Sequence, residues 1–178
     1  MLFRSMVLMF GVLSAGFAKP SLKSTPQKPV SFLNDVIPAL TRAGCNQGAC
    51  HGAAIGKGGF KLSLRGFAPE IDHLAIVHLA KGRRINLLAP EKSLFLQKPL
   101  LELPHIGGKA LKKGTQEYTI LLRWLLQGAP TPDPKDAHVV ALQVTPAVQS
   151  LAVKANVQLR VDALFSDGSK REIGRAHV

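Results

Sequence analysis

Two cysteines and an adjoining histidine are the residues of this sequence whose types and spacing could do chemistry. Cys45 and Cys50 are the only thiols of the 178-residue chain, and His51 directly follows the second. Two thiols can add across the two vinyl groups of a haem, and a histidine joined to the second one can reach the iron as proximal ligand. The usual attachment signature is C-x-x-C-H, whereas four residues separate the cysteines here. We interpret the motif as a lengthened haem c site, in which Gly48 and Ala49 give the loop room to bulge.

Two other uses of these residues remain open from the spacing alone. The cysteines of an exported protein can form a local disulfide. A Cys/Cys/His trio can also hold a metal, although a structural zinc site needs four ligands and no fourth is evident nearby. The haem interpretation is favoured because a disulfide has no use for the adjoining His51.

The first element that must position this motif is a helix directly before it. Ser31 is a candidate N-cap, and Pro38 predicts a kink or a restart because proline lacks the N–H group that a helix interior requires. The apolar positions fall at helical spacing, at Phe32, Leu33, Val36, Ile37 and Leu40. The helix therefore leads directly into the Cys45 loop.

The elements after the motif are predicted from the same kinds of pattern. Residues 60–65 alternate apolar and polar side chains, which predicts an extended segment with Phe60, Leu62 and Leu64 facing inward. Asp72 is a candidate cap for a second helix that runs to position 79. Thr115 caps a closing amphipathic helix that we expect to pack on the first one, with its apolar face at Tyr118, Leu121, Leu122, Trp124 and Leu125.

The chain divides into five segments by composition. Residues 1–18 have the basic start, short apolar run and small-residue end of a secretory signal peptide, and 19–30 form a polar linker. Residues 31–130 form the haem domain, 131–137 a proline-rich linker and 138–178 a β-rich segment with a turn at 166–169. The signal peptide predicts an exported protein, periplasmic or at the cell surface.

Several stretches of residues 31–130 together resemble the planctomycetal-type cytochrome c domain. They are GCNQGACHG at 44–52, GGFKLSLRGF at 58–67, PHIGG at 104–108 and WLLQGAP at 124–130. The resemblance implies a mainly α cytochrome c-like fold, bound haem c and electron transfer. The segment 138–178 resembles the start of a bacterial group 2 Ig-like domain, which implies an incomplete all-β sandwich and a possible contact with a cell surface or matrix.

The second axial ligand is predicted from an absence. The only methionines, Met1, Met6 and Met9, lie in the predicted signal peptide, so the mature chain has no methionine for the iron. His105 is our distal candidate, since it precedes the closing helix in the loop where related cytochromes usually present their distal methionine. The other candidates are a lysine, an external ligand, or one of His73, His78 and His138.

The charge balance indicates the kind of partner. Lys and Arg number 23 against 11 Asp and Glu, a formal net charge of +12. The cations are dispersed and few aromatic residues lie between them, so no nucleic-acid partner is expected. A basic surface near a haem suits an acidic redox partner protein. We therefore predict an electron carrier rather than an enzyme, with a haem peroxidase-like enzyme and a non-haem surface module with a Cys45–Cys50 disulfide as alternatives.

Overall fold

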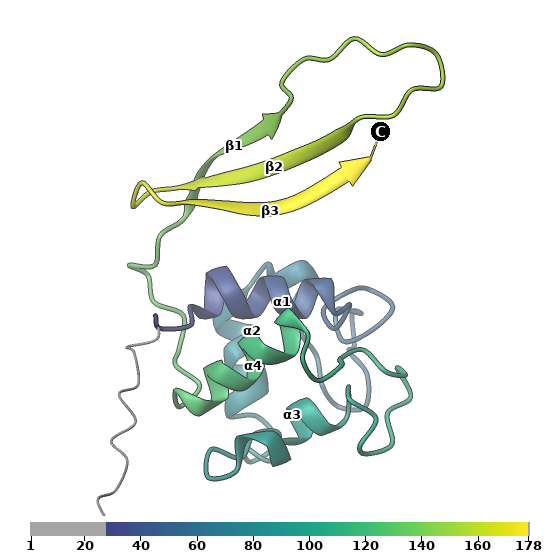
Figure 1. Ribbon diagram of the computed structural model, residues 1–178. Coiled ribbons are helices and arrows are strands. Elements are labelled where there is room, and N and C mark those ends of the chain that lie inside the picture. Colours follow the sequence, from purple (N-terminus) through teal and green to yellow (C-terminus); the bar gives the residue numbers. More distant parts are fainter. Residues whose placement is uncertain (1–27, 178) are drawn as a thin grey trace, which may run out of the picture.

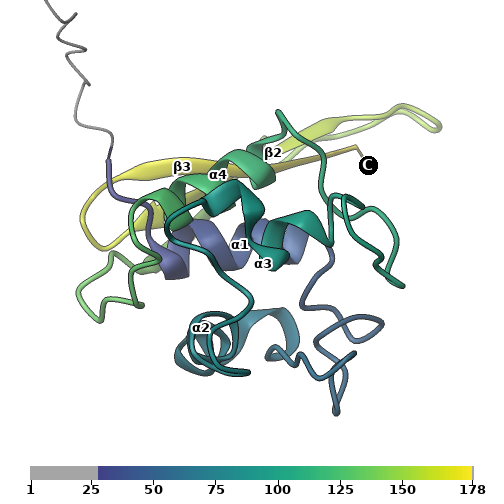
Figure 2. The same cartoon turned by 90° about the horizontal axis from the view of Figure 1, so that it is seen from below.

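The computed structural model describes residues 28–177, so the predicted signal peptide and most of the first linker lie outside the described residues. Figure 1 shows two parts, a cluster of short helices and a sheet of three strands, and the sheet lies on the side of the cluster that carries α1. Figure 2 shows the same arrangement from below, with the helices in front of the sheet. No helix within residues 28–177 is long and apolar enough to cross a membrane.

The first helix begins and restarts where the sequence predicts. Ser31 caps a π-helical turn, η1 (Phe32–Val36), and its side chain accepts a hydrogen bond from the Asn34 N–H. The α-helix α1 (Ile37–Arg42) follows, with Pro38 in its first turn. Proline is tolerated there because the first N–H groups of a helix have no intrahelical partner. The predicted restart at Pro38 is confirmed.

The closing helix α4 (Gln116–Leu126) is also confirmed, together with its Thr115 cap. It packs against α1 and η1 as expected. Its fully buried Trp124 contacts the rings of Phe32 and Phe95 and donates a hydrogen bond from Nε1 to the Pro130 carbonyl at 3.0 Å. The apolar core of the molecule lies entirely within residues 30–129.

The helix α2 (Pro69–Val77) begins earlier than predicted, and Asp72 does not cap it. Ala68 is the N-cap and Pro69 the first helical residue, so Asp72 lies within the first turn, where it is fully buried. Its carboxylate accepts hydrogen bonds from the Ser63 N–H and from the Ser63 hydroxyl at 2.7 Å. Asp72 therefore ties the segment before α2 to the helix instead of starting the helix.

The segment predicted as a strand at 60–65 is extended only at its start. Leu62 is buried and Phe60 half-buried, but Leu64 is exposed because a 3₁₀ turn, η2 (Leu64–Gly66), carries the chain away from the core. The turn includes Arg65 at φ +54°, a conformation that an alternation pattern cannot indicate. Two further short elements, η3 (Pro90–Lys92) and α3 (Leu94–Gln97), complete the helical cluster.

The predicted β-rich segment forms one antiparallel sheet of three strands in the order β1-β2-β3. They are β1 (Val139–Thr145), β2 (Gln158–Phe165) and β3 (Lys170–His177). Ala163 and Phe165 are the only buried apolar residues of the sheet among the described residues. Arg171 connects the sheet to the helices, because its guanidinium donates to the Asn34 carbonyl and the Asp35 carboxylate.

The expected fold class, a mainly α cytochrome c-like domain followed by an incomplete all-β Ig-like segment, is wrong. The structure is a mixed one, with short helices and a three-stranded antiparallel sheet. The longest helix has 11 residues, and turns and loops fill most of 43–68 and 98–115. Gly44, Pro99 and Gly128 follow the ends of α1, α3 and α4, and within residues 28–177 no second sheet packs on the first to form a sandwich.

Candidate functional site

The loop that carries both cysteines is a compact series of turns directly after α1. The Cys45 N–H donates to the Leu40 carbonyl at 2.9 Å, which continues the end of the helix. The His51 N–H donates to the Cys45 carbonyl at 3.0 Å, so the ends of the motif are bonded to each other. Both cysteines are free and half-buried. The loop therefore presents two thiols and one imidazole from a single closed turn.

The glycine that this loop requires is Gly52 rather than Gly48. Gly48 has open space around it and an ordinary backbone angle. A Cβ atom at Gly52 would overlap the backbone carbonyl of Asn46, which is part of the same turn. The close approach of Gly52 to Asn46 allows the five-residue step from Cys45 to Cys50 to close.

The imidazole of His51 is held by the segment that follows the loop. Its Nδ1 lies 3.0 Å from the Phe60 carbonyl, and the two rings pack with their centres 4.6 Å apart. Because a carbonyl can only accept, Nδ1 carries the proton in the neutral ring and Nε2 carries the lone pair. Burial lowers the pKa of His51, against the Phe60 carbonyl, which raises it. The neutral form, with Nε2 available to a metal, is thereby favoured.

His105 is bonded in the same way in the loop before the closing helix. Its Nδ1 lies 2.8 Å from the carbonyl of Gly108, three residues later in the same loop. The bond again directs the lone pair to Nε2. Gly107 must be a glycine for this loop to form, since a Cβ atom there would come within 2.9 Å of the His105 ring.

The structure brings these two imidazoles together. The ring centres of His51 and His105 are 6.3 Å apart, and the ring planes differ by 23°. Two imidazoles on opposite sides of one metal ion have their ring centres about 6 Å apart, given metal–nitrogen bonds of about 2 Å. The distance between the ring centres is therefore of the size that one metal ion between two imidazoles requires, and the rings are stacked.

Apolar side chains are exposed next to both histidines. Ile55 follows His51 in the loop and Ile106 is the neighbour of His105, and both side chains are almost completely exposed. Large apolar groups in water are unfavourable, so both exposed side chains are free to cover an apolar ligand. The four predicted site residues and these neighbours thus fit a haem.

Burial makes Cys45 different from an ordinary thiol. Cys45 packs against the apolar core, and its burial, with a further contribution from Cys50, raises its pKa from 9.0 to about 11. The side chain is therefore a neutral thiol at physiological pH. A thiol with a raised pKa is a poor nucleophile, so Cys45 does not suit an active site that uses a thiolate.

The other predicted parts of the site are placed elsewhere. Trp124 lies in the helical core, where its ring contacts are with Phe32, His73 and Phe95. His73 is buried and its Nε2 lies 2.9 Å from the Ala129 carbonyl, so it is a core histidine. His78 and His138 are exposed. Phe60 packs on the His51 ring, and the Leu62 N–H donates to the His51 carbonyl at 2.8 Å.

Three residues that support the loop are not evident from the sequence. Asn46 is fully buried, its Nδ2 donates to the Thr41 hydroxyl at 2.9 Å and its backbone carbonyl accepts from the Arg65 N–H. Asp72 holds Ser63, and Arg84 contacts the turn that carries Phe60. Their only sequence signal is a polar residue within an otherwise apolar or glycine-rich stretch.

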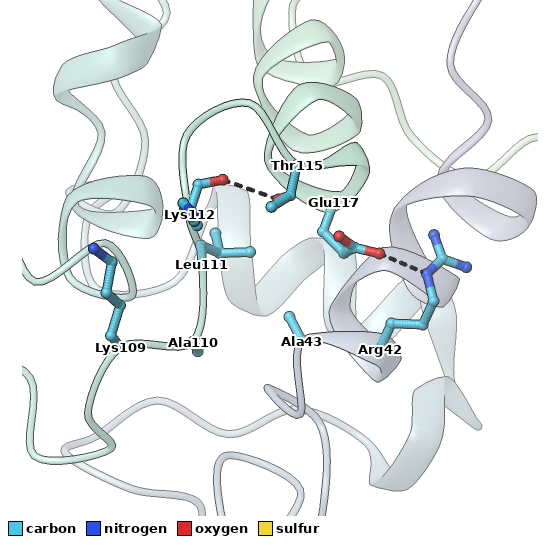
Figure 3. A pocket seen from close by; sticks show the side chains of 8 residues that line it. All are labelled: Arg42, Ala43, Lys109, Ala110, Leu111, Lys112, Thr115 and Glu117. Carbon is cyan, nitrogen blue, oxygen red and sulfur yellow. Dashed lines mark hydrogen bonds and ion pairs between the residues drawn. The ribbon is translucent and has the colours of Figure 1, made fainter.

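A pocket of about 460 Å³ opens at the start of α4, and Figure 3 shows its lining. None of the four predicted site residues lines it. Its only carboxylate, Glu117, is paired with Arg42 at 2.8 Å, and its only hydroxyl, that of Thr115, donates to the Lys112 carbonyl. The pocket thus lacks a nucleophile with a free base beside it, and we assign it no chemistry.

Comparison of the chain with known protein families, with curated proteins and with solved structures found no match in any of the three. Within residues 28–177 no group of three or more His, Cys, Asp and Glu side chains is arranged to hold a metal ion. His51 and His105 are two residues and so fall below that number.

Proposed function

We propose that the chain is an electron carrier with one covalently attached haem c. In this proposal Cys45 and Cys50 form the thioether links, His51 is the proximal ligand and His105 the distal ligand. The observation that carries the proposal is the pair of near-parallel imidazoles, 6.3 Å apart, each with its Nδ1 bonded to a backbone carbonyl. Histidines that bind metals commonly donate their other N–H to such a group, which fixes the tautomer and the ring orientation.

Haem c supplies an iron that takes up and releases one electron. The chain's own residues orient both imidazoles through their Nδ1 bonds, burial favours the neutral form of His51, and the apolar core behind Cys45 limits the access of water. With histidine in place of methionine as the distal ligand, the reduction potential is expected to lie below that of His/Met haems, because methionine raises it. A haem peroxidase would need an open position opposite His51, and the placement of His105 argues against one.

The partner that suits this site is an acidic redox protein. The stretch 52–69, which follows the proximal histidine, contains no acidic residue. Its three cations, Lys57, Lys61 and Arg65, are exposed, and none forms an ion pair with another described residue. Cations that are not neutralised locally attract an acidic surface and speed its approach. Since haem c attachment in bacteria takes place outside the cytoplasm, the proposal also includes export through residues 1–18.

Absorbance spectroscopy tests the assignment of all four residues. The protein, produced in an exporting host with haem-attachment machinery, is expected to show a low-spin haem c spectrum that survives denaturation. Cys45→Ala combined with Cys50→Ala is expected to abolish covalent attachment. His105→Ala is expected to keep the haem but give a high-spin spectrum or bind added imidazole, whereas the matched control His78→Ala keeps the wild-type spectrum. A colourless wild-type protein would refute the proposal, and an unchanged His105→Ala spectrum would remove His105 from it.

A further inference from the structure

Arg84 occupies a position that a surface cation seldom takes. Its guanidinium donates to three backbone carbonyls, those of Ala75 at 2.9 Å, Leu79 at 3.0 Å and Gly59 at 2.8 Å. Two of these carbonyls belong to the end of α2 and the turn after it, and the third belongs to the turn at 57–60. One side chain therefore joins two turns that are separated in sequence. A cation at a helix C-terminus is also favoured by the helix dipole.

The same guanidinium reaches His51 through a single intervening residue. It lies over the Phe60 ring, 4.6 Å from the ring centre, and the Phe60 ring in turn packs on His51 at 4.6 Å. The Phe60 carbonyl is also the acceptor for His51 Nδ1. Guanidinium, phenyl ring and imidazole thus form a continuous contact series from α2 to the proximal histidine.

Arg84 carries a charge that no acidic group balances directly. Among the described residues no carboxylate forms an ion pair with it, and its hydrogen-bond partners are neutral carbonyls. Its neighbour Arg83 adds a second positive charge. A half-buried cation is screened less by solvent than an exposed one, so its field extends to the imidazole behind Phe60.

We propose that Arg84 is a positioning residue for His51 and that it acts on this histidine in two ways. As a clamp, it holds the 57–60 turn against α2 so that the Phe60 carbonyl stays in place to accept from His51 Nδ1. As a fixed positive charge, it disfavours the oxidised, more positive iron and raises the reduction potential. The second role rests on the proposed haem function, and the first does not.

The clamp is tested on the protein before haem is attached. The amides of Lys57 and Phe60 donate across the turn, to the Phe60 and Lys57 carbonyls. In Arg84→Gln and Arg84→Lys, hydrogen exchange at these two amides is expected to be at least tenfold faster, and the ¹⁵N shifts of His51 are expected to move towards a mixture of tautomers. Arg83→Gln is the matched control, since it removes one exposed charge next to Arg84 and is expected to change neither measurement. Unchanged exchange in both Arg84 variants would overturn the clamp.

The charge is tested by redox titration of the haem-loaded variants. Arg84→Gln is expected to lower the potential by up to about 59 mV, which is a tenfold change in a one-electron equilibrium. Arg84→Lys keeps a charge nearby and is expected to recover most of this shift. Hydrogen exchange at the Lys57 and Phe60 amides of this variant is still expected to be fast. A potential of Arg84→Gln equal to that of the wild type, or no lower than that of Arg83→Gln, would overturn the electrostatic role. A protein without covalent haem would instead refute the proposed function, while the exchange result would still decide the clamp.

Discussion

The helical cluster and the sheet differ in how far their side chains are buried. The cluster has a continuous apolar core centred on Trp124, which is inaccessible to solvent, together with residues of α1, α4 and the segment around Leu62. Of the described apolar residues of the sheet only Ala163 and Phe165 are buried, and Leu142 in its first strand remains 61% exposed. Burial of apolar surface is the main source of stability. The comparison shows that the part with the proposed site can hold a fixed geometry, whereas the sheet depends on its hydrogen bonds and on the helices beside it.

The largest expected change in the free energy of unfolding comes from removing a buried aromatic side chain, and each part of the molecule offers one for comparison. Trp124→Ala is expected to lower the free energy of unfolding of the helical cluster by about 3–5 kcal/mol, because it leaves a large cavity and removes the Nε1 bond to Pro130. Phe165→Ala in the sheet is expected to leave that transition nearly unchanged, since Phe165 is outside the helical core. Denaturation followed by circular dichroism at 222 nm measures both. If Phe165→Ala weakened the helical transition as much as Trp124→Ala, the two parts would be one cooperative unit.

The second prediction concerns pH. The helical cluster is expected to lose stability at alkaline pH, and the sheet at acid pH. The pKa of Cys45 is raised from 9.0 to about 11, so the reduced, haem-free protein keeps its full stability below pH 9 and loses it as the pH rises towards 11. The expected loss is on the order of 2–3 kcal/mol, from about 1.4 kcal/mol for each pKa unit. Urea denaturation at pH 8, 9, 10 and 11 measures it, and Cys45→Ala is expected to show a smaller decline than the wild type.

The sheet is expected to weaken at acid pH instead. The hydrogen bond from Arg160 lowers the pKa of Asp162 below 3.8, so the stability that this ion pair contributes is present above that pH and lost as the pH falls through the lowered value. Hydrogen exchange of the β2 amides as the pH falls below 4, corrected for the intrinsic rate, checks this. A decline of both parts over one pH range would contradict the separation.

The smallest expected effect concerns the connection between the two parts. Arg171→Ala removes the contacts of the sheet with Asn34 and Asp35. Because the pair is partly exposed, the change in the free energy of unfolding is expected to be at most about 1 kcal/mol. Exchange of β3 amides is nevertheless expected to increase, since the sheet loses its hold on η1. Arg175→Ala is the control, because its ion pair with Glu172 lies within β3, and equal exchange in the two variants would show that Arg171 does not connect the parts.

Local features were predictable because they depend on neighbouring residues. Ser31 and Thr115 cap the helices predicted for them, Pro38 marks the restart, and the strands lie within the predicted β-rich segment. In each case a side chain acts on the backbone within four residues of itself, so the sequence itself contains the cause. The adjacency of Cys50 and His51 is likewise a property of the chain alone.

The tertiary structure decided what depends on residues far apart in the sequence. Asp72 is a residue type that commonly caps helices, yet folding places its carboxylate in a hydrogen bond with Ser63. Arg84 looks like one of many dispersed cations, and only the packing of α2 on the turn at 57–60 gives it three carbonyl partners. The fold class was missed for the same reason, because apolar periodicity does not show how soon a helix ends or whether a sheet gains a second layer. The approach of His105 to His51 is the clearest case: the sequence by itself determined two imidazoles, and only folding placed their rings 6.3 Å apart, because this distance depends on every turn between them.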